Sequence, residues 1–149
     1  MIYLIMFIYA ILAEYVVHRY FMHRKTLGGM FSWIYIDHAL EHHGKKRNDI
    51  NIEMPFMTVF VISLPLNIFV LFFGIKYSLI VILLSFLYSV VWTNLHKAHH
   101  NMGYNFIPKI PFYGLWKNYH LTHHNYPNKN YGTVFIYSDL LFGSYQWQK

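Results

Sequence analysis

The sequence predicts an all-α fold: a helical bundle embedded in a membrane, with about three spans (one helix plus a hairpin) and a helical cap on one face. The chain is 56% hydrophobic and only 12% charged, whereas soluble domains carry roughly 25% charged residues. Three apolar runs are long enough to cross a bilayer. All eleven histidines fall in four short clusters, at the ends of these runs or outside them. The length suits one domain, residues 1–149.

The remaining composition narrows the classes of protein and partner. There are no cysteines, which excludes disulfides, cysteine-bound zinc and iron–sulfur clusters. The formal charge of +6 would suit a nucleic-acid partner, but the lysines and arginines flank apolar runs and do not form a soluble basic face. That placement is typical of the charge bias in membrane proteins. We therefore expect the positively charged residues to lie at a membrane surface, and we expect no nucleic-acid partner.

The first apolar run leads into histidines. Residues 1–17 are apolar except for Glu14, and the run continues directly into His18 and His23. A signal peptide is the alternative, but a positively charged start and a small-residue cleavage site are not evident. At a rise of about 1.5 Å per residue, residues 1–23 make a helix that can cross a hydrocarbon core of about 30 Å. We predict one span whose last turns carry metal ligands.

A break and a short surface segment separate this span from the next. Gly28-Gly29 should end the helix. Residues 30–36 are aromatic and apolar but too short to span, as expected of a segment at the membrane interface. Residues 45–49 are a polar loop.

Two uncharged apolar runs, residues 54–73 and 77–95, predict a helical hairpin that crosses the membrane and returns. Pro65 lies in the middle of the first run and should kink it. Residues 101–149 are polar and aromatic, with several glycines and prolines. We expect them to form a cap of short helices and loops on the membrane face.

This arrangement places all four histidine clusters on one side of the membrane. The first span ends on that side, and the hairpin leaves it and returns to it. Of the twelve lysines and arginines, all except Lys76 belong to the same side. Positively charged residues near span ends mark the cytoplasmic side, so we predict that the histidines face the cytoplasm.

The spacing of the histidines is typical of metal ligands. Neutral imidazole binds Zn, Cu, Fe and Ni, and helical residues three or four apart share a face. Adjacent residues point about 100° apart, so a histidine doublet can reach two neighbouring metals, or one metal and its surroundings. One structural metal takes four ligands, whereas this set matches two metals with four or five ligands each. The candidate ligands are His18, His23, His38, His42, His43, His96, His99, His100, His120, His123 and His124.

Carboxylates are too scarce for a ferritin-like di-iron site. The chain has six acidic residues and lacks the paired Glu-x-x-His motifs of that site. The sequence therefore predicts a dinuclear site dominated by histidine. His18 and His23 are five residues apart, about 140° around an α-helix, and should approach the site from different angles.

The combined pattern resembles the fatty acid hydroxylase superfamily. The boxes H-x4-H, H-x3-H-H, H-x2-H-H and H-x2-H-H occur in this order, with the hairpin between the second and the third. The tail, with Asn130-Tyr131-Gly132 and the run from Asp139 to Ser144, is similar to the family's ending. There are two departures. The second box has one extra residue before its doublet, and Ser144 stands where threonine is usual.

The resemblance implies a membrane-bound, non-haem di-iron oxygenase that hydroxylates or desaturates a C–H bond of a lipid. The substrate would be a fatty-acyl chain or a sterol-like or isoprenoid lipid. The cofactors would be two iron ions, with zinc as a substitute, and O2 would be the co-substrate. An external donor of the cytochrome b5 or ferredoxin type would supply electrons. The location would be the endoplasmic reticulum in a eukaryote and the inner membrane in a bacterium.

Four further residues are candidates for the surroundings of the metals. Glu41 and Asp139 are the carboxylates expected to orient imidazoles. Asn130 and Tyr131, together with Gly132, are expected to shape the turn of the tail.

A second class of function is a histidine-rich membrane protein that binds or transports zinc without oxygenase activity. Transport predicts ligands near the middle of the bilayer, whereas these histidines lie at the ends of the spans. A catalytically silent member of the superfamily is the third alternative.

Overall fold

The computed structural model describes residues 1–25, 32–45, 53–103 and 106–147, and among them it contains helices and loops but no strand. The all-α prediction is confirmed. The elements, in chain order, are α1 (Ile2–Val16), the π-helix η1 (Val17–Met22), α2 (Ser32–Tyr35), the π-helix η2 (Ile36–Lys45), α3 (Phe56–Leu71), α4 (Ile75–His99), the 3-10 helix η3 (Ile107–Lys109), α5 (Tyr113–Asn125) and α6 (Tyr137–Leu141).

Two helices are long and apolar enough to cross a membrane. They are the continuous helix Ile2–Met22, formed by α1 and η1, and α4. In each, only 28% of the apolar window is buried, so most of the apolar surface faces outward, unlike a core helix of a soluble protein. The third predicted span, α3, has 16 residues, about one short of the usual minimum. A count of three spans, and their orientation, therefore stay predictions.

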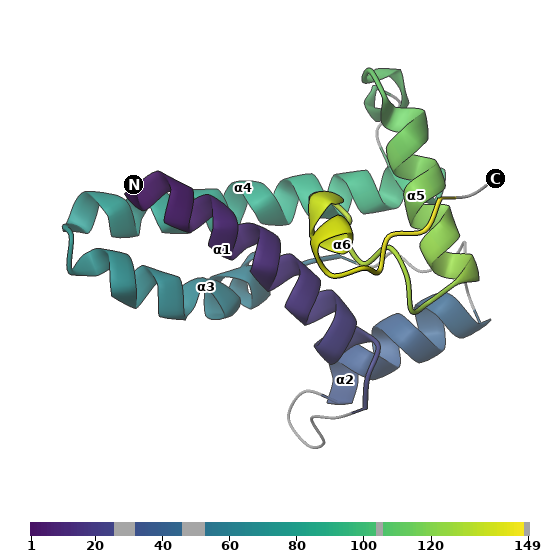
Figure 1. The fold of residues 1–149 in the computed structure, drawn as a ribbon, viewed down its shortest axis with the longest axis horizontal. Helices are drawn as coiled ribbons and strands as arrows, with labels where there is room; N and C mark the ends of the chain where they lie inside the picture. The colour runs from purple at the N-terminus through teal and green to yellow at the C-terminus, as the bar shows by residue number, and fades with distance from the viewer. Residues whose placement is uncertain (26–31, 46–52, 104–105, 148–149) are drawn as a thin grey trace.

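The predicted hairpin is present: α3 and α4 lie side by side and are joined at Gly74 (Figure 1). Gly74 has a φ of 127°, a value that glycine tolerates and other residues avoid. Hydrogen bonds between small polar side chains also join the two helices, from Ser78 to Asn67 (2.5 Å) and from Ser85 to Ser63 (3.0 Å). Such side chains allow close helix packing where the surroundings are apolar.

The region between the first span and the hairpin differs in detail from the prediction. Gly28-Gly29 and most of the 45–49 loop lie outside the described residues. Within the predicted interfacial segment, residues 30–36, the described part is helical as α2. This helix passes without a break into η2. One helical rod therefore carries the second histidine cluster across the end of the bundle (Figure 1).

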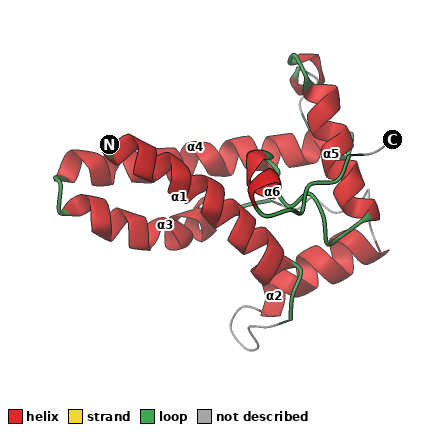
Figure 2. Ribbon diagram, viewed as in Figure 1, coloured by secondary structure: helices red, strands yellow, loops and turns green. Residues whose placement is uncertain are grey.

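The C-terminal part is helical at α5 and largely irregular afterwards (Figure 2). Helix α5 crosses the end of α4, next to η2. The chain then turns back, and α6 packs against α1. We call residues 130–144 the strap. The predicted cap is therefore present in α5, while the strap runs back beside the first span.

Candidate metal centre

Two π-helical turns put histidines that are five residues apart on the same side of their helices. In a π-helix the backbone hydrogen bonds run from i to i+5, so residues five apart become neighbours on successive turns. His18 and His23 flank this turn in η1, and their ring centroids are 5.1 Å apart. In η2, the rings of His38 and His43 are 4.9 Å apart. The prediction that His18 and His23 approach from different angles assumed α-helical winding and is wrong for that reason.

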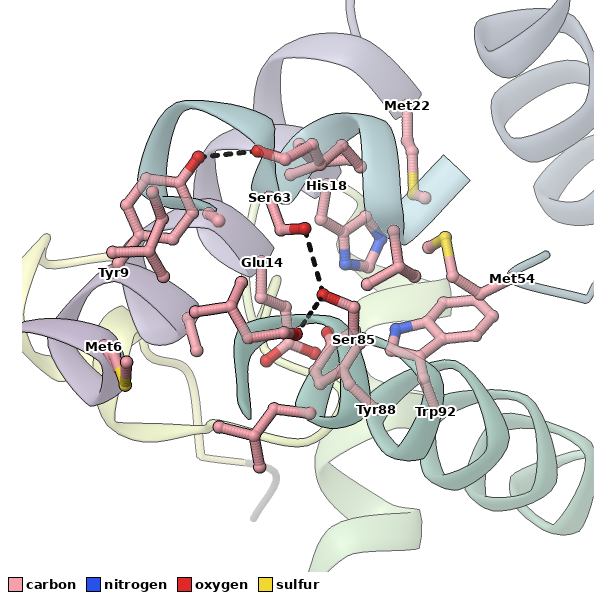
Figure 3. Close-up of a pocket in the computed structure, with 18 residues that line it drawn as sticks. Met6, Tyr9, Glu14, His18, Met22, Met54, Ser63, Ser85, Tyr88 and Trp92 are labelled. Atoms are coloured by element: carbon pink, nitrogen blue, oxygen red, sulfur yellow. Dashed lines mark hydrogen bonds between the residues drawn. The ribbon is translucent and has the colours of Figure 1, made fainter. Parts of the chain in front are cut away.

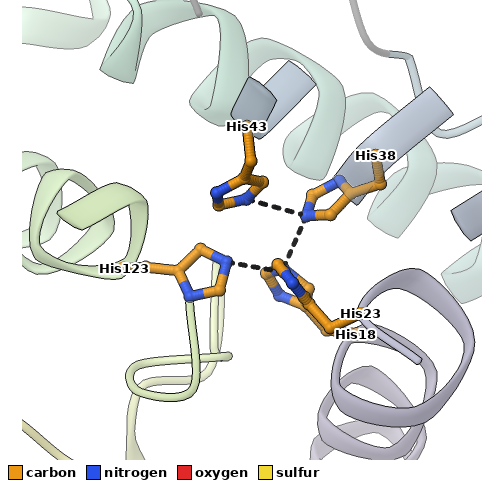
Figure 4. Close-up of side chains that lie close together, drawn as sticks. All are labelled: His18, His23, His38, His43 and His123. Carbon is orange, nitrogen blue, oxygen red and sulfur yellow. Dashed lines mark hydrogen bonds between the residues drawn. The ribbon is translucent and has the colours of Figure 1, made fainter. Parts of the chain in front are cut away.

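Five histidines converge in a first group, which Figure 4 shows. His18 Nε2 and His43 Nε2 lie 2.9 and 3.2 Å from the same atom, His38 Nε2. His23 Nε2 lies 3.0 Å from His123 Nε2. One ligand nitrogen from each residue falls within 4.8 Å of all the others. His38, which the extra residue in its box shifts from the usual spacing, belongs to this group.

A second group forms beside the first, and its ligand nitrogens satisfy the same 4.8 Å limit. It contains His42, His96, His100, His120 and His124. His120 Nε2 lies 2.9 Å from His100 Nε2 and 3.1 Å from His124 Nε2. The ring of His42 lies 4.6–4.7 Å from three other rings of the group.

Two histidine doublets are divided between the groups. His42 and His124 belong to the second group, whereas their neighbours His43 and His123 belong to the first. The rings of His43 and His124 stack where the groups meet, with centroids 4.1 Å apart. The sequence left open whether a doublet serves two metals or one. The geometry favours two metals for these doublets.

The third doublet behaves differently, because His99 lies in neither group. Its side chain is buried, and its ring stacks on that of His120 with centroids 4.9 Å apart. Ten of the eleven predicted ligands are thus brought together, and His99 packs behind one of them.

The donor set suits metal ions. Burial lowers the pKa of His23 to about 3, with a further contribution from His123, and lowers the pKa of His42 to about 3, with a further contribution from His100. Both imidazoles are therefore neutral near pH 7, as ligands must be. His42 Nε2 and His96 Nε2 are buried without a hydrogen-bond partner among the described residues. A bound cation would satisfy these otherwise costly orphan nitrogens.

Backbone carbonyls of the C-terminal segment orient two ligands of the first group. His18 Nδ1 contacts the Tyr131 carbonyl, and His123 Nδ1 lies 2.6 Å from the Lys129 carbonyl, just before the strap. A carbonyl only accepts, so each Nδ1 must carry the proton. That tautomer leaves the Nε2 lone pair of each ring available to a metal.

Asp139 holds the strap in shape without touching an imidazole. Its carboxylate accepts hydrogen bonds from the backbone N–H groups of Tyr131 (3.0 Å) and Gly132 (2.7 Å). It also accepts from the hydroxyls of Ser144 (2.6 Å) and Tyr119. The expected role of Asp139 in orienting imidazoles is thus indirect, through the backbone of residue 131.

Of the other residues predicted to surround the metals, Asn130 and Tyr131 have the expected role and Glu41 does not. Asn130 has a positive φ of 55°, and its side chain bonds the backbone of Gln146 in both directions and the Tyr119 carbonyl. Asn130 therefore shapes the turn as expected, and so does the backbone of Tyr131. Among the described residues, no hydrogen bond or ion pair to Glu41 is found. Its expected contact to an imidazole is not supported.

Sequence reasoning missed two buried side chains next to the histidines. Trp92 stacks on His96, with ring centroids 4.6 Å apart and planes 14° apart. Its i, i+4 spacing to a histidine on one helix was the available signal. Glu14 was noted only as an interruption of the first span. Its carboxylate accepts three backbone hydrogen bonds from the strap.

An apolar cavity of about 110 Å³ lies between α1, α3 and α4 and reaches the first histidine group (Figure 3). Among the described residues that line it, His18 is the one histidine, and Glu14, Tyr88 and Trp92 are close by. An apolar cavity of this size suits a piece of hydrocarbon rather than water.

Fold and site together indicate a membrane protein with two groups of histidines that could hold metal ions. A family model described as fatty acid hydroxylase matches residues 3–144, and the chain belongs to that family. No match was found among curated proteins or among solved structures. The resemblance inferred from the histidine boxes is confirmed.

Proposed function

We propose that the protein is a membrane-bound di-iron oxygenase that hydroxylates, or desaturates, a C–H bond in the apolar part of a lipid. The observation that carries this proposal is the apolar cavity that ends at His18, a member of the first five-histidine group. Family membership supports the same reaction class.

The two groups of histidines would each hold one iron ion. Iron bound there supplies the activation of O2 and the oxidation of an unactivated C–H bond. The protein itself positions the histidine rings and excludes water from the site. The Nδ1–H groups of His18 and His123 donate hydrogen bonds to backbone carbonyls, which fixes the rings. The apolar lining keeps water away from the reacting carbon.

The cavity favours a linear hydrocarbon segment as the part of the substrate that reaches the histidines. It lies between α3 and the two helices that are long enough to span, so a lipid chain could enter it from the bilayer without passing through water. A fatty-acyl chain satisfies this condition, and a sterol-like or isoprenoid tail does as well.

Hydroxylation consumes O2, two electrons and two protons, and releases one water molecule. We propose that a separate protein of the cytochrome b5 or ferredoxin type supplies the electrons. The histidine-bearing ends of the helices would face the cytoplasm, where such donors and most of the chain's positive charges would meet. In a eukaryote this would be the endoplasmic reticulum, and in a bacterium the inner membrane.

The test begins with metal content. Detergent-purified protein is reconstituted with iron, and the expected result is about two iron ions per chain. The loaded protein is then given a reduced donor, O2 and a lipid extract, and the lipids are analysed by mass spectrometry. The expected product has gained one oxygen atom, or has lost two hydrogen atoms.

A variant with His123→Ala is the matched control, because it removes one ligand of the first group. Unchanged lipid masses with fully iron-loaded protein, across several donors, would refute the oxygenase. Stoichiometric zinc that iron cannot replace would favour the zinc-binding alternative.

A further inference from the structure

The strap has an unusual combination of irregular backbone and apolar surface. In α6 and just beyond it, Leu140 and Leu141 expose 59% and 74% of their surface, and Tyr137 and Phe142 are exposed as well. Surfaces in contact with water rarely carry several adjacent exposed apolar side chains. This apolar surface therefore needs a partner.

The strap lies beside the first span, not beyond its end. Phe135 packs edge-on against Phe7, with ring centroids 5.9 Å apart, and Phe142 stacks on Tyr15 at 4.4 Å. Phe7 precedes His18 by eleven residues, which is about 16 Å along a helix. Helix α6 packs against α1 (Figure 1). The strap therefore reaches well back from the histidine end.

All six backbone N–H groups from residue 130 to residue 135 have acceptors inside the protein. Ser144 provides a carbonyl for residue 130, and Asp139 accepts from residues 131 and 132. Glu14 accepts from residues 133, 134 and 135 at 2.8–2.9 Å. Irregular backbone is tolerated at membrane depth only when its polar groups are satisfied in this way.

We infer that the strap is re-entrant: α6 and the turn before it lie in the hydrocarbon layer, with Leu140 and Leu141 against lipid chains. Exposed Ile8 and Leu12 on α1 continue the same kind of apolar surface. Glu14 has a specific part in this arrangement. An acidic residue is needed at this position of the first span because the backbone N–H groups of residues 133–135 would otherwise be buried without an acceptor.

Site-directed labelling tests the depth directly, and the natural chain has no cysteine to remove. Leu141→Cys receives a thiol-reactive fluorophore, and the protein is placed in phosphatidylcholine vesicles. Quenching is measured with a nitroxide on the lipid chain and with aqueous iodide. Leu83→Cys, exposed on the middle of α4, is the lipid-facing control. Lys109→Cys, an exposed lysine position outside the spans, is the water-facing control.

We expect quenching by the lipid nitroxide at position 141 to match that at position 83 and to exceed that at position 109 several-fold. Iodide should show the reverse order. Strong iodide quenching at position 141 would overturn the proposal. Weak quenching by both agents would also overturn it, since a protein partner or a second copy would then cover α6.

The part played by Glu14 is tested in the labelled Leu141→Cys protein. Glu14→Leu leaves three N–H groups without an acceptor, whereas Glu14→Gln keeps one acceptor oxygen. We expect lipid quenching at position 141 to fall several-fold in Glu14→Leu and less in Glu14→Gln. Unchanged quenching in Glu14→Leu would remove Glu14 from the proposal. If Glu14→Leu does not fold, the comparison with positions 83 and 109 still decides the depth.

Discussion

The two histidine groups are built from the same residue type but are held in different ways. In the first group, two rings are fixed by carbonyls of residues 129 and 131, and the C-terminal segment that provides them is held by Asp139. In the second group, packing holds the rings: His96 lies against Trp92, and His120 lies against His99. The first group borders the apolar cavity, through His18.

The difference indicates how one chain can make two similar sites with different sensitivities. The first group depends on a segment that is more than a hundred residues away from His18 in the sequence. The second depends on neighbours within its own helices. Changes in the strap should therefore affect the first group selectively.

The largest expected effects come from removing one ligand of either group. His123→Ala should lose the metal of the first group, and His120→Ala that of the second, because each variant removes one of five neighbouring imidazoles. Metal analysis should give about one metal per chain in each variant, with loss of lipid oxidation in both. Full metal content in either one would contradict the division into two groups.

His99→Ala is the control for this pair. His99 is buried next to His120 but lies outside both groups. The variant should keep both metals. It should lose some thermal stability, because a buried ring is replaced by a methyl group. Loss of a metal would make His99 a ligand after all.

Asp139→Asn should weaken the first group and leave the second intact. The amide that replaces the carboxylate cannot accept from Tyr131, Gly132, Ser144 and Tyr119 together. Loss of such supporting contacts typically reduces metal affinity by about 10–100-fold. A chelator titration should show one weakened metal and one unchanged metal. Asp37→Asn, at an exposed position of η2, is the matched control and should change neither.

Gly132→Ala should destabilise the strap without removing any ligand. A Cβ at this position would lie 2.3 Å from the Phe135 carbonyl oxygen, so the backbone must move. Overpacking of this kind costs about 1–3 kcal/mol. Gly114→Ala in α5 is the control, because a Cβ there meets nothing within 4 Å. Thermal unfolding should show a lower midpoint for the first variant and an equal or higher one for the second.

The smallest contrast between the groups is expected in their response to pH. Burial lowers the pKa of His23 in the first group and of His42 in the second to about 3, and that of His100 to about 4. In the unfolded chain these groups titrate near pH 6.5. Below that pH the unfolded state binds more protons than the folded state, so stability falls as the pH falls.

The metal-free protein should therefore unfold at progressively lower temperature from about pH 7 to about pH 4, with each such histidine contributing up to about 1.4 kcal/mol per pH unit. Unfolding midpoints measured across this range give the slope. A flat profile would mean that the imidazoles are not buried as described.

Much of the fold was predictable because periodicity and apolar length depend on local sequence. The runs that became α1 and α4 were visible in this way, as was the hairpin turn between residues 73 and 77. Ten of the eleven predicted ligands are brought together. They could be predicted because histidines that cluster in a sequence have few roles other than metal binding.

The remaining features depend on contacts that sequence spacing does not contain. The π-helical winding of η1 and η2 is decided by tertiary packing, so α-helical angles misplaced His23 relative to His18. His99 lies outside both groups, although its spacing matches that of the ligands. The pairing of Glu14 with residues 133–135 joins segments whose sequences carry no mutual signal.

The π-helical turn after α1 also sets a rotational phase. Glu14 must face the strap while His23, nine residues later, must face the first group. If residues 17–22 were wound as an α-helix with no change in length, one of these side chains would be rotated by about 100° relative to the other. The π-helical turn therefore allows Glu14 to face the strap and His23 to face the first group at the same time. Both contacts constrain the length of the H-x4-H box.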